Sequence, residues 1–174
     1  MTMSMAVRKK RLTPSDITAL KGERPIVSLT AYTTPIAKLL DAHCDLLLVG
    51  DSLGMVVYGM ESTVGVTMEM MIAHGQGVMR GSKAACVVVD MPFGSYQGNS
   101  KEALNSSIRI MKESGAHAVK MEGGAEVAES IKRILSAGIP VMGHLGLIPQ
   151  SIYKFGTYAV RAKEEAEATR LEED

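Results

Sequence analysis

Three carboxylates and one imidazole each come directly after a short run of aliphatic residues. These residues are Asp51, Asp90, Glu122 and His144. In parallel α/β proteins the C-terminal ends of the strands face a common crevice, so we expect the four side chains to converge there. Carboxylate oxygens suit a hard cation such as Mg²⁺, whose remaining positions are filled by water and substrate. The alternative is that the acidic residues only cap helices or form turns.

Lys120 lies within one of these aliphatic runs, two residues before Glu122. Residues two apart in a strand point to the same face, so both side chains should face the same way. A lysine inside an apolar strand is costly unless it is paired or used. We expect Lys120 to anchor an anionic substrate, and the alternative is a structural ion pair with Glu122.

Other polar motifs give weaker signals. Ser52 and a permissive glycine follow Asp51 in one short loop, which would let a metal and a ligand oxygen bind together. Neither a Walker A motif nor a dinucleotide-binding fingerprint is present, and no Ser-His-Asp order or Cys-His pair stands out. His43, His74 and His117 lack metal-ligand spacing, so we expect them on the surface or in packing.

The composition indicates one ordinary soluble domain covering residues 1–174. The chain is 46% hydrophobic and its 19 basic residues balance 19 acidic ones, which argues against nucleic-acid and anionic-membrane partners. The one basic run is residues 8–11, and no apolar run approaches the roughly 20 residues of a membrane span. The first eleven residues lack the apolar core of a secretory signal, so we expect a cytoplasmic protein. Cys44 and Cys86 are predicted to be buried thiols.

Aliphatic runs alternate with helical patterns, which is typical of βα units around a parallel sheet. An N-terminal segment, residues 1–24, should hold a short helix capped by Thr13 with Pro14 at its first position and closed by Gly22. Thr34 before Pro35 predicts a second capped helix with an apolar stripe. The predicted strands are residues 25–31, 45–50, 84–89, 117–121 and 140–144. Two further helices should end at Gly115 and Gly138.

Five predicted strands leave two architectures open. A (β/α)8 barrel typically takes about 250 residues, whereas this chain ends with a charged segment, residues 161–174, that reads as the start of a helix. The sheet is therefore either a small doubly wound sheet or a barrel without its last strands.

Four blocks in this order are similar to the ketopantoate hydroxymethyltransferase family, the 3-methyl-2-oxobutanoate hydroxymethyltransferases of pantothenate biosynthesis. The similarity runs from about Pro25 to the end of the chain. The resemblance implies a (β/α)8 TIM barrel of the phosphoenolpyruvate/pyruvate superfamily, incomplete here at about five βα units. It also implies Mg²⁺ dependence, 5,10-methylenetetrahydrofolate as co-substrate and a homodecamer. The blocks are Val49-Gly-Asp-Ser-Leu-Gly-Met55, Asp90-Met-Pro-Phe93, Val119-Lys-Met-Glu-Gly-Gly124 and Gly143-His-Leu-Gly-Leu-Ile-Pro-Gln150.

The resemblance also implies roles for individual residues. Asp51 and Asp90 match the metal carboxylates that also contact the 2-oxoacid, and Glu122 matches a third carboxylate that often acts through water. Ser52 and Lys120 match positions that hold the substrate's carboxylate and keto oxygen. His144 matches a histidine near the product hydroxyl, which makes it the candidate catalytic residue. Tyr32 falls in a family motif at the end of the first strand.

The chain resembles roughly the first two-thirds of the family's length. The family's proton-accepting glutamate is expected beyond Asp174, so no residue here inherits that role and a poor or inactive chain is expected. The predicted reaction is Mg²⁺-dependent hydroxymethyl transfer from 5,10-methylenetetrahydrofolate to 3-methyl-2-oxobutanoate. The alternatives are a 2-oxoacid lyase or mutase of the same superfamily, and an inactive fragment that binds metal or co-assembles with full-length subunits.

Overall fold

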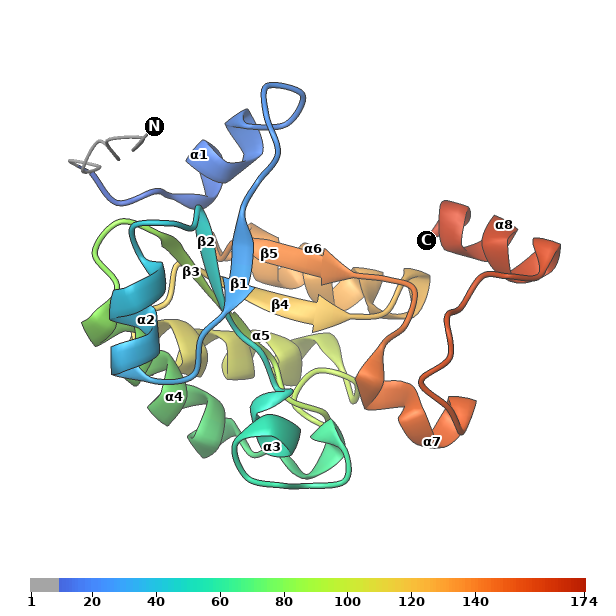
Figure 1. The fold of residues 1–174 in the computed structure, drawn as a ribbon. Helices are drawn as coiled ribbons and strands as arrows, with labels where there is room; N and C mark the ends of the chain where they lie inside the picture. Colours follow the sequence, from blue (N-terminus) through green and yellow to red (C-terminus); the bar gives the residue numbers. More distant parts are fainter. Residues whose placement is uncertain (1–9) are drawn as a thin grey trace.

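The computed structural model describes residues 10–174, which form one five-stranded parallel sheet (Figure 1). The strands are paired in the order in which they occur in the sequence, β1 to β5. A doubly wound sheet reverses its strand order at a switch point, whereas a (β/α)8 barrel adds each new strand to the same edge. The order therefore favours the barrel over the doubly wound sheet. The strands are β1 (Ser28–Thr30), β2 (Leu46–Val49), β3 (Cys86–Asp90), β4 (Ala118–Glu122) and β5 (Val141–His144).

The observed strands lie within or next to the five predicted runs, and the differences are at their ends. β1 is only three residues long, at the edge of the sheet. Asp90 and Glu122 are the last residues of their strands rather than the first residues after them, and His144 ends its strand as in the predicted run. Each of these polar side chains is thus held by a hydrogen-bonded strand and not by a loop.

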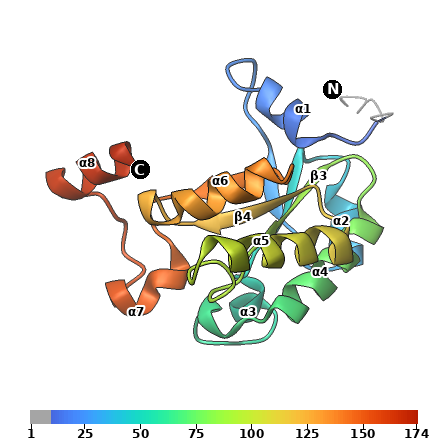
Figure 2. The same ribbon diagram turned by 180° about the vertical axis from the view of Figure 1, so that it is seen from behind.

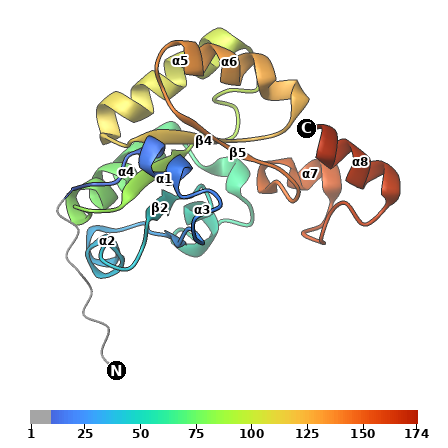
Figure 3. The same ribbon diagram turned by 90° about the horizontal axis from the view of Figure 1, so that it is seen from above.

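Four helices cover one face of the sheet: α2 (Thr34–Leu40), α4 (Met68–Gly81), α5 (Ser100–Arg109) and α6 (Ala128–Ser136) (Figure 2). The short helix α1 (Pro14–Ala19) lies near the N-terminal ends of the strands (Figures 1 and 3). At the other end of the strands lie α3 (Leu53–Val56), η1 (Thr63–Gly65), η4 (Pro149–Ser151) and α7 (Ile152–Phe155). The remaining elements are the π-helical turn η2 (Ile110–Ser114), η3 (Ala125–Val127) and α8 (Glu165–Glu173).

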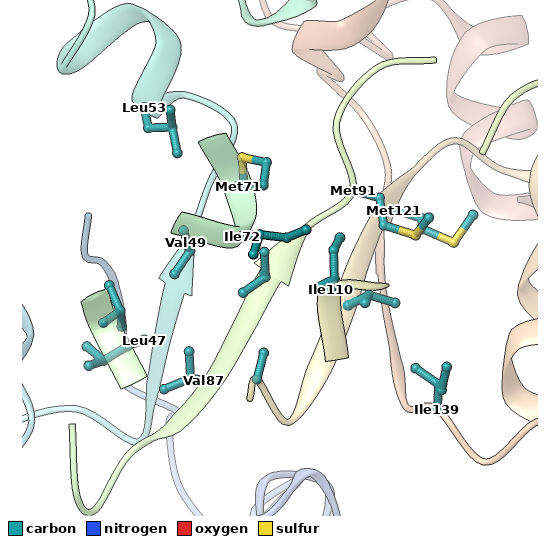
Figure 4. Packing of buried hydrophobic residues seen from close by; sticks show 14 of the residues in the cluster. Leu47, Val49, Leu53, Met71, Ile72, Val87, Met91, Ile110, Met121 and Ile139 are labelled. Carbon is teal, nitrogen blue, oxygen red and sulfur yellow. The ribbon is translucent and has the colours of Figure 1, made fainter. Parts of the chain in front are cut away.

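The two faces of the sheet form two separate apolar clusters, because alternate strand residues point in opposite directions. Figure 4 shows the larger cluster, in which Leu47, Val87 and Met121 pack against the helical layer. The smaller cluster is built from Leu46, Cys86, Val88 and Ala118, with Ile17 of α1 packed against it. Asp90 and Lys120 share the face of the smaller cluster, since they lie two residues beyond Val88 and Ala118.

Helix ends follow the predicted chemistry with two corrections. Thr13 and Asp16 form a full capping box at the start of α1, with Pro14 in the first turn. That helix ends at Ala19 and not at Gly22, which has φ +81° in the turn that follows. The cap of α2 is Thr33 rather than Thr34, because the Thr33 hydroxyl accepts the N–H of Ile36. Gly115 and Gly138 have positive φ just after η2 and α6, as predicted.

The predicted apolar stripe of α2 is oriented differently from the expectation. Ile36 and Leu39 are exposed, and the buried residue of the helix is Ala37. Ala37 lies directly against Gly81 of α4, where a Cβ atom would stand 2.5 Å from the carbonyl oxygen of Thr34. Gly75 of α4 is equally crowded, since a Cβ there would stand 2.8 Å from the Cβ of Ser114. Helix α4 therefore approaches its neighbours through glycines rather than through large side chains.

Some predictions concern residues at the beginning of the chain. The basic run lies partly outside the described residues, as does most of the segment examined for a targeting signal. Arg11 is described, and its guanidinium donates to Ser82 and Ala85. Both cysteine thiols are buried, as predicted. Across residues 10–174, no helix has the length and apolar character needed to cross a membrane.

Candidate functional site at the C-terminal ends of the strands

Strand register brings the predicted polar residues together in pairs. Asp90 of β3 is aligned with Lys120 of β4, and Glu122 of β4 is aligned with His144 of β5. Aligned residues on neighbouring strands point to the same face. Their side chains therefore meet at the C-terminal edge of the sheet.

Lys120 pairs with Asp90 and not with Glu122. Its ammonium Nζ lies 2.6 Å from Oδ1 of Asp90, and both side chains are buried. The predicted alternative of an ion pair with Glu122 therefore places the lysine on the wrong partner. Burial raises the pKa of the Asp90 carboxyl, while the charge and hydrogen bond of Lys120 oppose that shift.

Asp51 reaches the same place from the loop after β2. Its backbone N–H donates to Oδ2 of Asp90 at 3.0 Å, so the two carboxylates are neighbours. Burial, followed by the negative charge of Asp90, raises the pKa of Asp51 to about 7. Glu122 contributes to the same rise. The site thus contains more carboxylates than the single buried ammonium of Lys120 neutralises.

Glu122 is held at both oxygens. Nδ1 of His144 lies 3.0 Å from Oε1, and the backbone N–H of Gln150 donates to Oε2 at 3.0 Å. His144 is only half-buried, so the carboxylate is inside the protein and the imidazole lies at its boundary.

Ser52 and Tyr32 form a second polar pair beside Asp51. The Tyr32 hydroxyl lies 2.8 Å from the Ser52 hydroxyl, which joins the loop after β1 to the loop after β2. His74 of α4 supports this pair from behind, since its Nδ1 lies 2.6 Å from the backbone oxygen of Tyr32. His74 thus has a structural contact next to the site, within the surface-or-packing role predicted for it.

Two buried residues at the site were not assigned a role from the sequence. The Gln150 side chain donates from Nε2 to Oδ2 of Asp51 at 2.8 Å, and its Oε1 accepts from the Tyr96 hydroxyl at 2.7 Å. The Tyr96 oxygen accepts the backbone N–H of Glu122 at 3.1 Å. Burial raises the pKa of the Tyr96 phenol, which keeps it a neutral donor. Gln150 lies in a block noted for its family resemblance, and Tyr96 carries no signal in the sequence.

The carboxylates gather without forming a ready-made cage for a metal. Among residues 10–174, no three His, Cys, Asp or Glu side chains are placed together as ligands of one ion. Mg²⁺ is commonly held by only one or two carboxylates, with water and substrate oxygens completing its shell. Asp51 and Asp90 fit that smaller donor set, because they are adjacent and the described residues give no hydrogen bond to Oδ1 of Asp51.

The C-terminal segment encloses a cavity of about 400 Å³ beside this edge. The cavity lies between α8 and the loops after β4 and β5, and its lining includes Gly123, Gly146 and Arg161. Asp51, Asp90 and Lys120 do not line it. The cluster of carboxylates and the cavity are therefore neighbouring but distinct features.

Comparison with known proteins decides the family. The family model described as "Ketopantoate hydroxymethyltransferase" matches residues 11–174. The chain belongs to the ketopantoate hydroxymethyltransferase family. It is 59% identical over 172 residues to the 3-methyl-2-oxobutanoate hydroxymethyltransferase of Sinorhizobium fredii, covering 99% of this chain and 63% of the relative. The chain is 60% identical to the 3-methyl-2-oxobutanoate hydroxymethyltransferase of Rhizobium rhizogenes, covering 99% of this chain and 63% of the relative. It is 58% identical to that of Brucella canis, of which it covers 62%.

Solved structures confirm the predicted fold class for this member of the ketopantoate hydroxymethyltransferase family. It resembles a 2,3-dimethylmalate lyase of the PEP mutase/isocitrate lyase superfamily, with TM-score 0.59, 17% identity and coverage of 91% of this chain and 58% of the lyase. It also resembles a phosphonopyruvate hydrolase solved with oxalate and Mg²⁺, with TM-score 0.62, 15% identity and coverage of 90% and 56%. At these identities the likeness shows the fold alone. The chain matches somewhat under two-thirds of the length of its curated relatives.

Proposed function

We propose that this chain carries the metal and 2-oxoacid site of an enzyme that transfers a hydroxymethyl group from 5,10-methylenetetrahydrofolate to 3-methyl-2-oxobutanoate, giving 2-dehydropantoate. The observation that carries the proposal is the buried group of Asp51, Asp90 and Lys120 at the C-terminal strand ends. Relatives that match along almost the whole chain are named for this reaction. The proposal includes a cytoplasmic location and assembly into a homo-oligomer, a decamer by family resemblance.

The charge of the site supports binding of a divalent cation. Asp51 is buried beside Asp90, and burial, followed by the negative charge of Asp90, raises its pKa. Asp51 and Asp90 are the residues that would hold Mg²⁺, and Glu122 would reach it through water. When bound beside a chelating 2-oxoacid, Mg²⁺ polarises the keto group and makes the C3 proton easier to remove.

The cationic and hydroxyl groups support binding of the organic substrate. Lys120 has two further ammonium hydrogens beyond the one directed at Asp90, and it would direct positive charge at the substrate's carboxylate or keto oxygen. Positive charge fixed beside an oxygen that becomes more negative during reaction stabilises the transition state. Ser52, held by Tyr32, would donate to the same acid, and His144 would lie near the product hydroxyl.

The test is a turnover assay of the 1–174 chain with Mg²⁺, 3-methyl-2-oxobutanoate and 5,10-methylenetetrahydrofolate. The full-length relative of Sinorhizobium fredii is the positive control. Product formation that requires the folate supports the transferase, and cleavage or rearrangement without folate would indicate a lyase or mutase instead. Retained Mg²⁺ and 2-oxoacid binding without turnover would restrict the function of this chain to binding. A chain that binds neither Mg²⁺ nor the 2-oxoacid would contradict the proposal.

A further inference from the structure

Gln150 is the residue through which two separate carboxylates of the site are connected. It lies in η4, directly after the loop that follows β5, and its side chain is 5% exposed. The side chain donates to Oδ2 of Asp51, and the backbone N–H donates to Oε2 of Glu122. Asp51 lies in the loop after β2 and Glu122 ends β4, and the two share no direct hydrogen bond in the described part of the chain.

All four hydrogen-bonding positions of the Gln150 amide are occupied. Nε2 donates to Oδ2 of Asp51 at 2.8 Å and to the backbone oxygen of Met91 at 2.9 Å. Oε1 accepts from the Tyr96 hydroxyl at 2.7 Å and from Nε2 of Gln97 at 3.0 Å. A primary amide has two donors and two acceptor positions, so this one is saturated. A buried amide without such partners would be unfavourable, which makes this orientation strongly preferred.

Two acceptors, Oδ2 of Asp51 and the backbone oxygen of Met91, determine which end of the Gln150 amide faces Asp51. The Tyr96 oxygen accepts the backbone N–H of Glu122, and its hydroxyl lies 2.7 Å from Oε1 of Gln150 and 3.2 Å from the backbone oxygen of Glu122. The shorter of the two contacts supports the same amide orientation. The amide nitrogen must therefore face Asp51. One continuous chain of hydrogen bonds runs from the backbone of Glu122 through Tyr96 and Gln150 to the carboxylate of Asp51.

The donor that orients Asp51 is neutral, and this has a chemical consequence. Asp90 is paired with the ammonium of Lys120, which neutralises part of its charge. An amide fixes the direction of a carboxylate without cancelling its charge, and here it uses Oδ2 of Asp51. Among the described residues, none donates a hydrogen bond to Oδ1, which leaves that oxygen available to a cation.

We propose that Gln150, supported by Tyr96, is a positioning residue that presents Oδ1 of Asp51 to the divalent cation. The inference rests on the proposed function, since it assumes that Asp51 binds the metal. Partners that orient a metal ligand typically change metal affinity or activity by about 10- to 100-fold when they are removed.

The experiment measures Mg²⁺ affinity by calorimetry in the 1–174 chain. Gln150→Met keeps the length of the side chain and removes its donors and acceptors, so we expect affinity to fall by about 10- to 100-fold. Tyr96→Phe leaves the amide in place and removes one donor to its oxygen, so we expect a smaller loss. Gln76→Met is the matched control, because Gln76 donates to Glu113 away from the site and the same substitution there should leave affinity unchanged.

The readout separates positioning from folding. Loss of positioning weakens affinity at unchanged stoichiometry, whereas partial unfolding lowers stoichiometry and leaves the affinity of the folded fraction unchanged. If Gln150→Met does not fold, Tyr96→Phe decides. Unchanged affinity in a folded Gln150→Met or, failing that, in Tyr96→Phe would overturn the positioning role and leave the proposed function standing. Wild-type protein that binds no Mg²⁺ would overturn the proposed function, and this inference with it.

Discussion

The two ends of the sheet both contain buried charged groups, but they satisfy them in opposite ways. At the N-terminal end, Asp41 accepts the Ser82 hydroxyl and the backbone N–H groups of residues 83, 84 and 85. At the C-terminal end, Asp51 has one amide donor and lies beside Asp90 and Glu122. Both aspartates are buried, with 9% and 3% of their surface exposed.

The pKa values of the two aspartates shift in opposite directions. Burial works against ionisation of Asp41, yet the hydrogen bonds from Ala85, Ser82 and their neighbours hold its pKa below the usual value. Burial and neighbouring negative charge raise the pKa of Asp51 to about 7. Burial alone therefore does not distinguish a structural carboxylate from a functional one, whereas the number and charge of its partners does. In barrel enzymes the N-terminal end is typically the stabilising end and the C-terminal end the reactive one.

Asp51→Asn should give the largest effect. If Asp51 is a metal ligand, turnover by the active enzyme should fall on the order of 10²-fold, the size seen when one group that stabilises developing charge is removed. Stability in a chelator should stay equal or rise, because the substitution removes a buried charge next to Asp90. Steady-state kinetics and urea unfolding measure the two quantities. An Asp51→Asn variant that loses stability and keeps activity would show that Asp51 has a structural role and not a functional one.

Asp41→Asn is the same substitution at the other end and should have the opposite profile. The new amide has one oxygen in place of two and directs N–H groups at the donors of residues 83–85, so buried donors lose their acceptor. The free energy of unfolding should fall by about 1–3 kcal/mol. Activity per folded molecule should be unchanged. Urea unfolding combined with activity normalised to folded protein checks this, and a specific loss of turnover would contradict it.

His117 should give the smallest effect and tests the N-terminal end by pH. Its Nδ1 accepts the backbone N–H of Val87, which requires the neutral ring, and burial, with Arg11 nearby, lowers its pKa. The unfolded chain then binds the proton more readily than the folded one. Stability should be full above the unfolded pKa of about 6.5 and fall as pH drops through the folded pKa.

The matched variant for that test is His117→Gln, which does not titrate. Unfolding free energies at about pH 7 and pH 5 should differ less in His117→Gln than in the wild type. An equal difference in both proteins would show that the acid sensitivity comes from a group other than His117.

The sequence predicts the C-terminal cluster well because strand alternation is a local property. Lys120 and Glu122 share a face by their spacing alone, and Asp90 ends a run of buried valines. The ion-pair partner of Lys120 cannot be predicted from spacing within one strand, because it depends on how β3 and β4 are aligned. Register is set by the packing of whole strands, so the alternative that paired Lys120 with Glu122 named the wrong partner.

Loop residues were the least accessible to prediction. Gln150 and Tyr96 meet across 54 positions of sequence, and neither shows a periodicity that indicates burial. The prediction for α2 failed for a related reason. The helical period indicates that Ile36 and Leu39 lie on one side of the helix, but only tertiary packing decides whether that side or the side of Ala37 faces the sheet. N-cap chemistry was reliable to within one residue, as the shift from Thr34 to Thr33 shows, whereas α1 ends at Ala19 and not at the predicted Gly22.

The glycines through which α4 contacts its neighbours have a consequence for the order of folding. Each interior glycine disfavours an isolated helix by about 1 kcal/mol relative to alanine, so α4, with Gly75 and Gly77 in its interior and Gly81 as its last residue, is a poor autonomous helix. Its stability must come from close contact with α2 and with the turn at Ser114. A nascent chain that ends before Ser114 therefore lacks one of the two contacts that stabilise α4, the contact between Gly75 and Ser114. This helix should acquire lasting protection from hydrogen exchange only after the β3–α5–β4 portion has collapsed onto it.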